Sequence, residues 1–241
     1  MQQALLLRQT SIGKKAIVAV TGVVMFGFLL GHMIGNLQVF LGPEALNHYA
    51  ELLHSKPPLL WTVRIVLLAS IAAHIYYSMV LASEAGDARP RPYAMRENNA
   101  TNLAALSMRL SGPTVALFLV YHLLHLTFGF SPTHAHSATD VYANVMGSFQ
   151  IWWLAAIYMG AQLLLALHLF HGAWSFFQTL GISHPRYNAF RRYFAAGITF
   201  LIVGGNITIP AAILSGLYTS EQVEAAPAED EPIEARNIVV E

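Results

Sequence analysis

Residues 16–41 read AIVAVTGVVMFGFLLGHMIGNLQVFL, a stretch without a single Asp, Glu, Lys or Arg. At a rise of about 1.5 Å per residue, an α-helix of this length crosses the roughly 30 Å hydrocarbon core of a bilayer. Four more apolar segments of similar length lie near residues 59–83, 106–130, 150–180 and 193–219. Inside lipid, only helices and closed barrels satisfy their own backbone polar groups, and these segments lack the strict alternation of barrel strands. The sequence therefore predicts an all-α integral membrane protein, built as a bundle of five transmembrane helices.

The composition of the 241 residues agrees with a membrane protein and excludes several other classes. Hydrophobic residues make up 55% of the chain and charged residues 11%, whereas a typical soluble domain carries roughly 25% charged residues. The formal net charge is +0, so no basic field exists that would attract nucleic acid. Cysteine is absent, which excludes disulfides, iron–sulfur ligation and thioether-linked haem in this chain.

The distribution of Lys and Arg predicts the orientation of the bundle, because cytoplasmic loops are enriched in these residues. Ten of the thirteen lie on the side where the chain begins, namely Arg8, Lys14, Lys15, Arg89, Arg91, Arg96, Arg109, Arg186, Arg191 and Arg192. The other side holds Lys56, Arg64 and Arg236. We therefore expect the N-terminus in the cytoplasm and the C-terminus outside.

Two segments outside the spans have their own character. Residues 43–56, PEALNHYAELLHSK, follow the helix-start signal Pro43 and end before another pair of prolines, which predicts a short interfacial helix. The tail, residues 220–241, holds seven of the thirteen acidic residues and few large apolar ones, and we expect it to be a solvated extension.

Eleven histidines are many for so apolar a chain, and six of them fall inside the predicted spans. Neighbouring helices alternate in direction, so the place of a residue along its span gives its depth. His32 and His122 come late in outward-running helices and are expected in the outer half of the membrane. His74 and His168 come late in inward-running helices and are expected in the inner half. The histidines outside the spans, expected to be solvated, are His48, His54, His134, His136 and His184.

Four successive helices each supplying one buried imidazole favour a shared site. An isolated intramembrane histidine is often no more than a hydrogen-bonded core residue, but ionisable groups in lipid are costly and usually face a partner. Two imidazoles facing each other at one level form an axial ligand pair for haem iron, while zinc usually takes four ligands at one level. The pattern predicts two stacked haem b groups enclosed by the bundle, an outer one on His32 and His122 and an inner one on His74 and His168. A haem-free transporter that uses these histidines for metal ions or protons is the alternative from another class.

Several supporting features have two interpretations. Gly27, Gly31 and Gly35 recur on one face of the first helix, either as a groove for a flat macrocycle or as a helix–helix contact. Arg64 and Arg109 are candidates to pair with haem propionates, or they extend to the membrane interface.

The fourth span carries two histidines three residues apart, and only one can ligate the inner iron from this helix. Depth slightly favours His168, and His171 would then bind a propionate or a quinone. His122 and His125 raise the same question in the third span, where His125 is expected near the outer surface. As a quinone pocket we name Arg109, His171 and Gln178, polar groups near the inner interface.

The chain resembles a known family, the two-haem cytochrome b anchor of succinate:menaquinone oxidoreductases and fumarate reductases that have a single five-helix anchor subunit. The resemblance spans roughly residues 10–215 and rests on SIGKKAIVAVTG at the first helix, GHMIGN around His32, AAHIYYS around His74, MRLSGP with its Gly112 ten residues before His122, and LHLFHGAWSFFQTLG around His168.

This resemblance implies that His32 and His122 ligate the haem distal to the soluble subunits. It implies that His74 and a fourth-helix histidine ligate the proximal haem, and leaves His168 and His171 as alternatives. It further implies a non-catalytic subunit of succinate dehydrogenase in a bacterial inner membrane, with flavoprotein and iron–sulfur partners on the cytoplasmic face and menaquinone or another quinone as substrate. Some relatives carry a glutamate in the fourth helix as part of a proton route, whereas AQLLLALHLFHG at residues 161–172 has none. The anchor of a nitrate reductase or hydrogenase would share the ligand pattern and differ in its soluble partners.

Overall fold

The computed structural model describes residues 9–88, 103–131, 136–182 and 184–219. Five long helices dominate these ranges: α1 (Ser11–Asn36), α3 (Pro57–Asp87), α4 (Leu103–His122), α6 (Trp152–Thr179) and α7 (Asn188–Leu214). With the short turns that extend them, they form five spans long and apolar enough to cross a membrane, Ser11–Leu41, Pro57–Asp87, Leu103–Thr127, Trp152–Thr179 and Pro185–Leu214. The predicted all-α chain with five candidate membrane-spanning helices is confirmed, which is the architecture of a multi-pass membrane protein. Arg8, Arg89, Arg91, Arg96, His134, Arg236 and the tail lie outside the described residues.

Local signals in the sequence set where several helices begin. The hydroxyl of Thr10 accepts a hydrogen bond from the backbone amide of Gly13 at 3.0 Å and caps α1. Pro57 occupies the first position of α3, where the missing amide hydrogen costs nothing. Pro43 does the same for α2 (Pro43–His54), which confirms a helix in this predicted interfacial segment. Gly42, at a φ of 99°, makes the turn into α2 in a conformation that a residue with a side chain rarely adopts.

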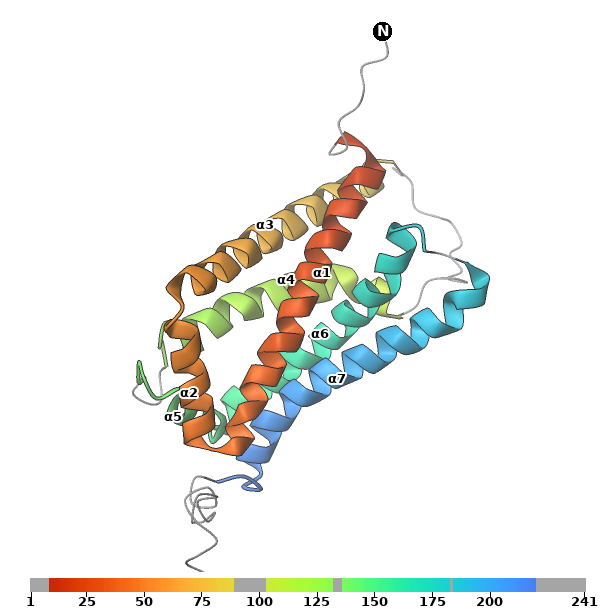
Figure 1. The fold of residues 1–241 in the computed structure, drawn as a ribbon. Helices are drawn as coiled ribbons and strands as arrows, with labels where there is room; N and C mark the ends of the chain where they lie inside the picture. The colour runs from red at the N-terminus through yellow and green to blue at the C-terminus, as the bar shows by residue number, and fades with distance from the viewer. Residues whose placement is uncertain (1–8, 89–102, 132–135, 183, 220–241) are drawn as a thin grey trace, which may run out of the picture.

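The long helices associate in pairs. Helix α1 packs along α3, α4 packs along α6, and α6 packs along α7, while α1 also meets α6 and α7. Figure 1 shows these helices running side by side, with α2 and α5 (Val141–Phe149) gathered at the end of the bundle where α1 finishes. We call this the Asn36 end and the opposite end the Ser11 end. At the crossing of α1 and α7, a Cβ on Gly205 would lie 2.5 Å from the Met33 sulfur, so the close approach needs glycine.

Polar contacts and a buried cluster close the Asn36 end. The Asn47 amide donates to Asp140 Oδ1 at 3.0 Å, and the Tyr142 backbone amide donates to Asn47 Oδ1 at 3.0 Å, which ties α2 to α5. The Tyr218 hydroxyl donates to the Val39 carbonyl at 2.5 Å. Beneath these bonds lies an apolar cluster that includes Val39, Leu46, Tyr142, Met146, Phe149 and Ile209. These contacts hold the connecting segments over the ends of the long helices.

At the Ser11 end, one arginine differs from the sequence-based expectation. Arg191 was expected on the exposed cytoplasmic face, but only 1% of it is exposed. Its guanidinium donates to Asn188 Oδ1 at 3.0 Å and to the Trp174 carbonyl at 3.1 Å, and lies over the Trp174 ring. These contacts compensate the burial of the charge, and they join the start of α7 to α6. Lys14 and Glu84 form an ion pair that joins α1 to α3 at the same end.

Candidate functional site

His32 and His122 face each other across the bundle. His32 lies on α1 and His122 is the last residue of α4, and their ring centroids are 5.8 Å apart with the planes at 86°. Phe28, one turn before His32 on α1, stacks on the His32 ring at 5.3 Å and 16°. On the other side, Phe118 lies against the His122 ring at 6.0 Å. The structure thus brings together two imidazoles that the sequence places at the same depth.

His74 and His168 form a second pair nearer the Ser11 end. His74 on α3 and His168 on α6 have ring centroids 6.2 Å apart, with the planes at 59°. His74 Nδ1 lies 3.1 Å from the Val18 carbonyl oxygen and 3.2 Å from the Thr21 hydroxyl. A carbonyl can only accept, so Nδ1 carries the hydrogen and Nε2 keeps its lone pair. Helix α1 therefore orients the ring and leaves Nε2 available as a ligand.

Both separations suit one metal ion between two imidazoles. A bond from a metal to a histidine nitrogen is about 2 Å long, and the ring centre lies about 1 Å further away, so two rings on opposite sides of one ion have centres about 6 Å apart. No group of three or more His, Asp or Glu side chains that could hold a metal ion occurs among the described residues. The two pairs therefore fit a planar cofactor that supplies the remaining ligands itself, such as haem.

The surroundings of the rings also fit such a group. Nδ1 of His122 and Nδ1 of His168 are buried, and neither has a hydrogen-bond partner among the described residues. A buried polar atom without a partner costs about 1–3 kcal/mol, so protein atoms alone leave these rings incompletely satisfied. Two glycines lie beside the second pair, where a Cβ would be in ordinary van der Waals contact with the rings, 3.5 Å from His74 for Gly22 and 3.7 Å from His168 for Gly112.

The glycines of α1 separate into two roles. A Cβ on Gly27 or Gly31 would meet no heavy atom within 4 Å, whereas a Cβ on Gly35 would lie 2.6 Å from the Tyr49 ring. Gly35 therefore makes a close contact with α2, and the two other glycines border open space on the helix that carries His32. The contact interpretation of this glycine pattern holds for Gly35 alone.

The other predicted site residues differ in their exposure. His171 is half-buried on α6, while Arg109 and Gln178 are exposed. Arg64 is exposed and lies over the ring of Trp61, its neighbour on α3, at 5.2 Å. His48, His54, His136 and His184 are exposed, as predicted for solvated residues.

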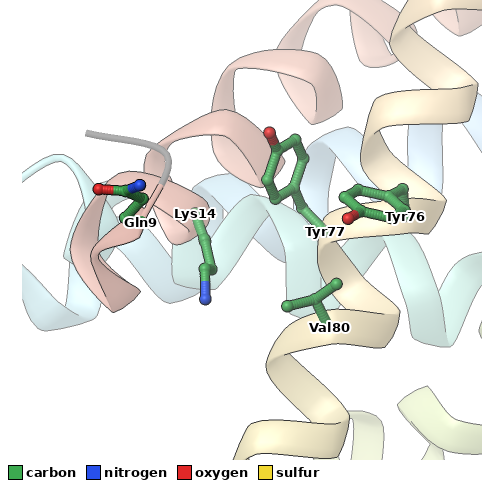
Figure 2. A pocket seen from close by; sticks show the side chains of 5 residues that line it. All are labelled: Gln9, Lys14, Tyr76, Tyr77 and Val80. Carbon is green, nitrogen blue, oxygen red and sulfur yellow. The ribbon is translucent and has the colours of Figure 1, made fainter. Parts of the chain in front are cut away.

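A pocket of about 480 Å³ opens at the Ser11 end, between the start of α1 and the last turns of α3. Figure 2 shows its lining, with Gln9 and Lys14 from the N-terminal side and Tyr76, Tyr77 and Val80 from α3. The Gln9 amide and the two phenols are groups that can donate hydrogen bonds, and the Lys14 ammonium, paired with Glu84, lies beside them, so the pocket suits a ligand with carbonyl or other acceptor oxygens. Tyr77 follows His74 by three residues and shares its side of the helix, which places the pocket about one turn from the His74 pair.

Comparison of the chain with known protein families, curated proteins and solved structures finds no match.

The contacts of His125 were not predicted from the sequence. It lies at the Asn36 end, in the π-helical turn Leu123–Thr127 that continues α4, and is 2% exposed. Its Nδ1 lies 2.9 Å from the Tyr158 hydroxyl, and its Nε2 lies 3.4 Å from the Ser148 hydroxyl. Ser148 belongs to α5, in a stretch where sequence analysis predicts no helix. The available signal was Asp140, whose carboxylate accepts from the Ala143 amide at 2.9 Å and caps α5.

Proposed function

We propose that this chain is the membrane anchor and haem b electron-transfer subunit of a succinate:quinone oxidoreductase. The observation that carries the proposal is the pair of facing imidazoles at each of two depths, with ring centroids 5.8 Å and 6.2 Å apart, from four different helices. Two haem b groups would be held there, one on His32 and His122 and one on His74 and His168. Haem held there would supply one-electron oxidation and reduction.

The chain's own residues bind and orient these groups. His168, rather than His171, is the proposed partner of His74, because its ring faces the His74 ring. The Val18 carbonyl accepts from His74 and fixes its tautomer. Arg64 and Arg109 remain the candidates for propionate pairing, one near each end of the bundle. The spans are apolar, so water would have little access to groups held between them.

Quinone would be reduced or oxidised at the Ser11 end. Two sets of residues are candidates to bind its head group: Arg109, His171 and Gln178, and the pocket lined by Gln9, Lys14, Tyr76, Tyr77 and Val80. The second set lines the pocket of about 480 Å³ at this end. Donors there would bind the quinone oxygens. The haem proposed on His74 and His168 would lie about one helical turn away, close enough to exchange electrons with the quinone.

In this proposal the Ser11 end faces the cytoplasm of a bacterium, and flavoprotein and iron–sulfur subunits dock on it. Exposed cations at this end include Lys15, Arg186 and Arg192, which suit acidic partners. The partners would hold the succinate chemistry, and this chain would connect their electrons to the quinone pool in the membrane.

The test is to purify the complex from its native membrane, identify its subunits and titrate its absorbance spectrum with reductant. We expect two b-type components with distinct midpoint potentials, a flavoprotein and an iron–sulfur protein. If the chain co-purifies with subunits of a nitrate reductase or hydrogenase, the haem assignment stands but the assignment to a succinate:quinone oxidoreductase is overturned. A spectrum without b-type bands would overturn the proposal and favour a histidine-containing transporter.

A further inference from the structure

The Asn36 end of the bundle contains a buried polar pair that the proposed electron transfer does not use. His125 Nδ1 lies 2.9 Å from the hydroxyl of Tyr158 on α6, and 7% of Tyr158 is exposed. The Ser148 hydroxyl contacts the other ring nitrogen of His125 and donates to the Asn144 carbonyl at 2.6 Å. The pair is thus anchored to α5 as well as to α6.

The π-helical turn explains why His125 points at Tyr158. The Phe128 amide donates to the Leu123 carbonyl, five residues back, at 2.9 Å. In a regular α-helix, residues three apart share a face, and His125 would follow His122. The wider turn separates the two side chains, so that His122 faces His32 while His125 contacts α5 and α6. Such single π-helical turns occur often at functional sites.

Tyr158 forms one wall of the position that His122 occupies. The two rings have centroids 5.8 Å apart at 65°, and Phe118 lies on His122 at 6.0 Å. Phe149 also packs against Tyr158, with ring centroids 4.9 Å apart. The ring of Tyr158 is therefore held by packing and its hydroxyl by His125. The His122 ring beside it has no hydrogen bond at Nδ1 to the described residues, and ring contacts with His32, Phe118 and Tyr158 hold it.

Packing alone does not explain this choice of residues. Phenylalanine would fill the place of Tyr158, and an apolar side chain that of His125, without the cost of removing polar groups from water. A hydrogen bond within a membrane bundle contributes only about 1 kcal/mol. What the polar pair adds is direction, because the hydrogen bond fixes the rotation of the His125 ring and the position of the Tyr158 oxygen, and with it how the Tyr158 ring lies against His122.

We propose that His125 and Tyr158 are positioning residues that fix the orientation of the His122 imidazole, and thereby the electronic state of the haem on His32 and His122. This inference rests on the proposed function, which makes His122 an iron ligand. The two histidines of α4 then have separate roles, His122 as a ligand and His125 as the residue that orients it through Tyr158.

The test uses electron paramagnetic resonance and redox titration of the oxidised complex, because the relative orientation of two axial imidazoles sets the spectrum of a low-spin haem. Tyr158→Phe keeps the ring and removes the hydrogen bond. His125→Phe removes the same bond from the other side, and His125→Asn places an amide where Nδ1 lies. The matched control is Tyr121→Phe, which removes a hydroxyl from the same ring cluster that makes no hydrogen bond to the described residues.

We expect Tyr158→Phe and His125→Phe to shift the signal and midpoint potential of one haem and leave the other unchanged. The double variant should shift no further than either single variant, because both remove the same bond. His125→Asn should restore most of the original signal, and Tyr121→Phe should not alter it. Loss of one haem in His125→Phe, with retention in His125→Asn, would also support the inference.

Unchanged signals in Tyr158→Phe with both haems present would overturn the inference and leave the proposed function intact. A wild-type complex without haem would instead overturn the proposed function. If His125→Phe does not assemble, Tyr158→Phe still decides, since it removes one buried oxygen only.

Discussion

The imidazole rings of His32 and His122 stand almost perpendicular to each other, at 86°, whereas those of His74 and His168 are inclined at 59°. The four side chains come from four helices, and the two pairs lie at different levels along the bundle. The difference in angle means that the two sites are not equivalent. The proposed haems should therefore be distinguishable in potential and in spectrum.

Removal of one axial ligand should remove one haem of the two. His32→Ala or His122→Ala leaves a single imidazole at that level, and we expect about half of the haem to be lost while the component on His74 and His168 remains. Haem content per chain and a redox titration measure this. His48→Ala, an exposed histidine of α2, is the control and should keep both haems. Full haem content in His32→Ala would contradict the assignment.

The two histidines of α6 should behave differently. His168 faces the His74 ring, so His168→Ala should lose the haem at that level. His171→Ala should retain both haems, with at most a change in quinone reactivity. The two variants are compared by absorbance of the reduced complex at equal protein concentration. The opposite result, with loss in His171→Ala only, would make His171 the ligand.

Thr21→Val should raise the midpoint potential of the haem on His74. The Thr21 hydroxyl donates to the Ile17 carbonyl at 2.7 Å, so its lone pairs accept from His74 Nδ1 at 3.2 Å. Loss of an acceptor makes the imidazole a weaker donor to iron and favours the reduced state. Because the Val18 carbonyl remains, the shift should correspond to less than a tenfold change in equilibrium constant, below about 59 mV. Thr208→Val, which removes a similar hydroxyl from α7, should leave both potentials unchanged. A lowered potential in Thr21→Val would show that the hydroxyl acts in another way.

The spans and the depth of the histidines could be predicted from the sequence, because both follow from simple rules. A long apolar run in lipid must be helical, and consecutive helices alternate in direction. His32, His74, His122 and His168 therefore could be sorted into two levels by counting along the chain. The structure places the rings of each level together, at separations that counting cannot give.

Features that depend on tertiary contacts could not be predicted in this way. The contacts of His125 depend on the π-helical turn, and the residues LLHLT carry no signal that predicts such a turn. Arg191 carries a charge next to a span, a position that normally indicates the interface, yet contacts with Trp174 and Asn188 compensate its burial. The pocket beside Tyr77 depends on how the start of α1 meets α3, which no pattern within one helix records.

Arg191 and Arg192 are neighbours in sequence with opposite environments, and they provide a matched test of the Ser11 end. Arg191 is buried and donates to two partners, while Arg192 is exposed and lies over the Trp174 ring at 5.8 Å. Arg191→Gln cannot span both partners and removes the charge above Trp174, so we expect a loss of about 2–3 kcal/mol in the free energy of unfolding. Arg192→Gln should cost less than about 1 kcal/mol, because solvent already screens that charge. Unfolding of the purified protein in detergent, followed by circular dichroism, compares the two variants. Equal stability of both variants would mean that the buried guanidinium does not hold α6 to α7.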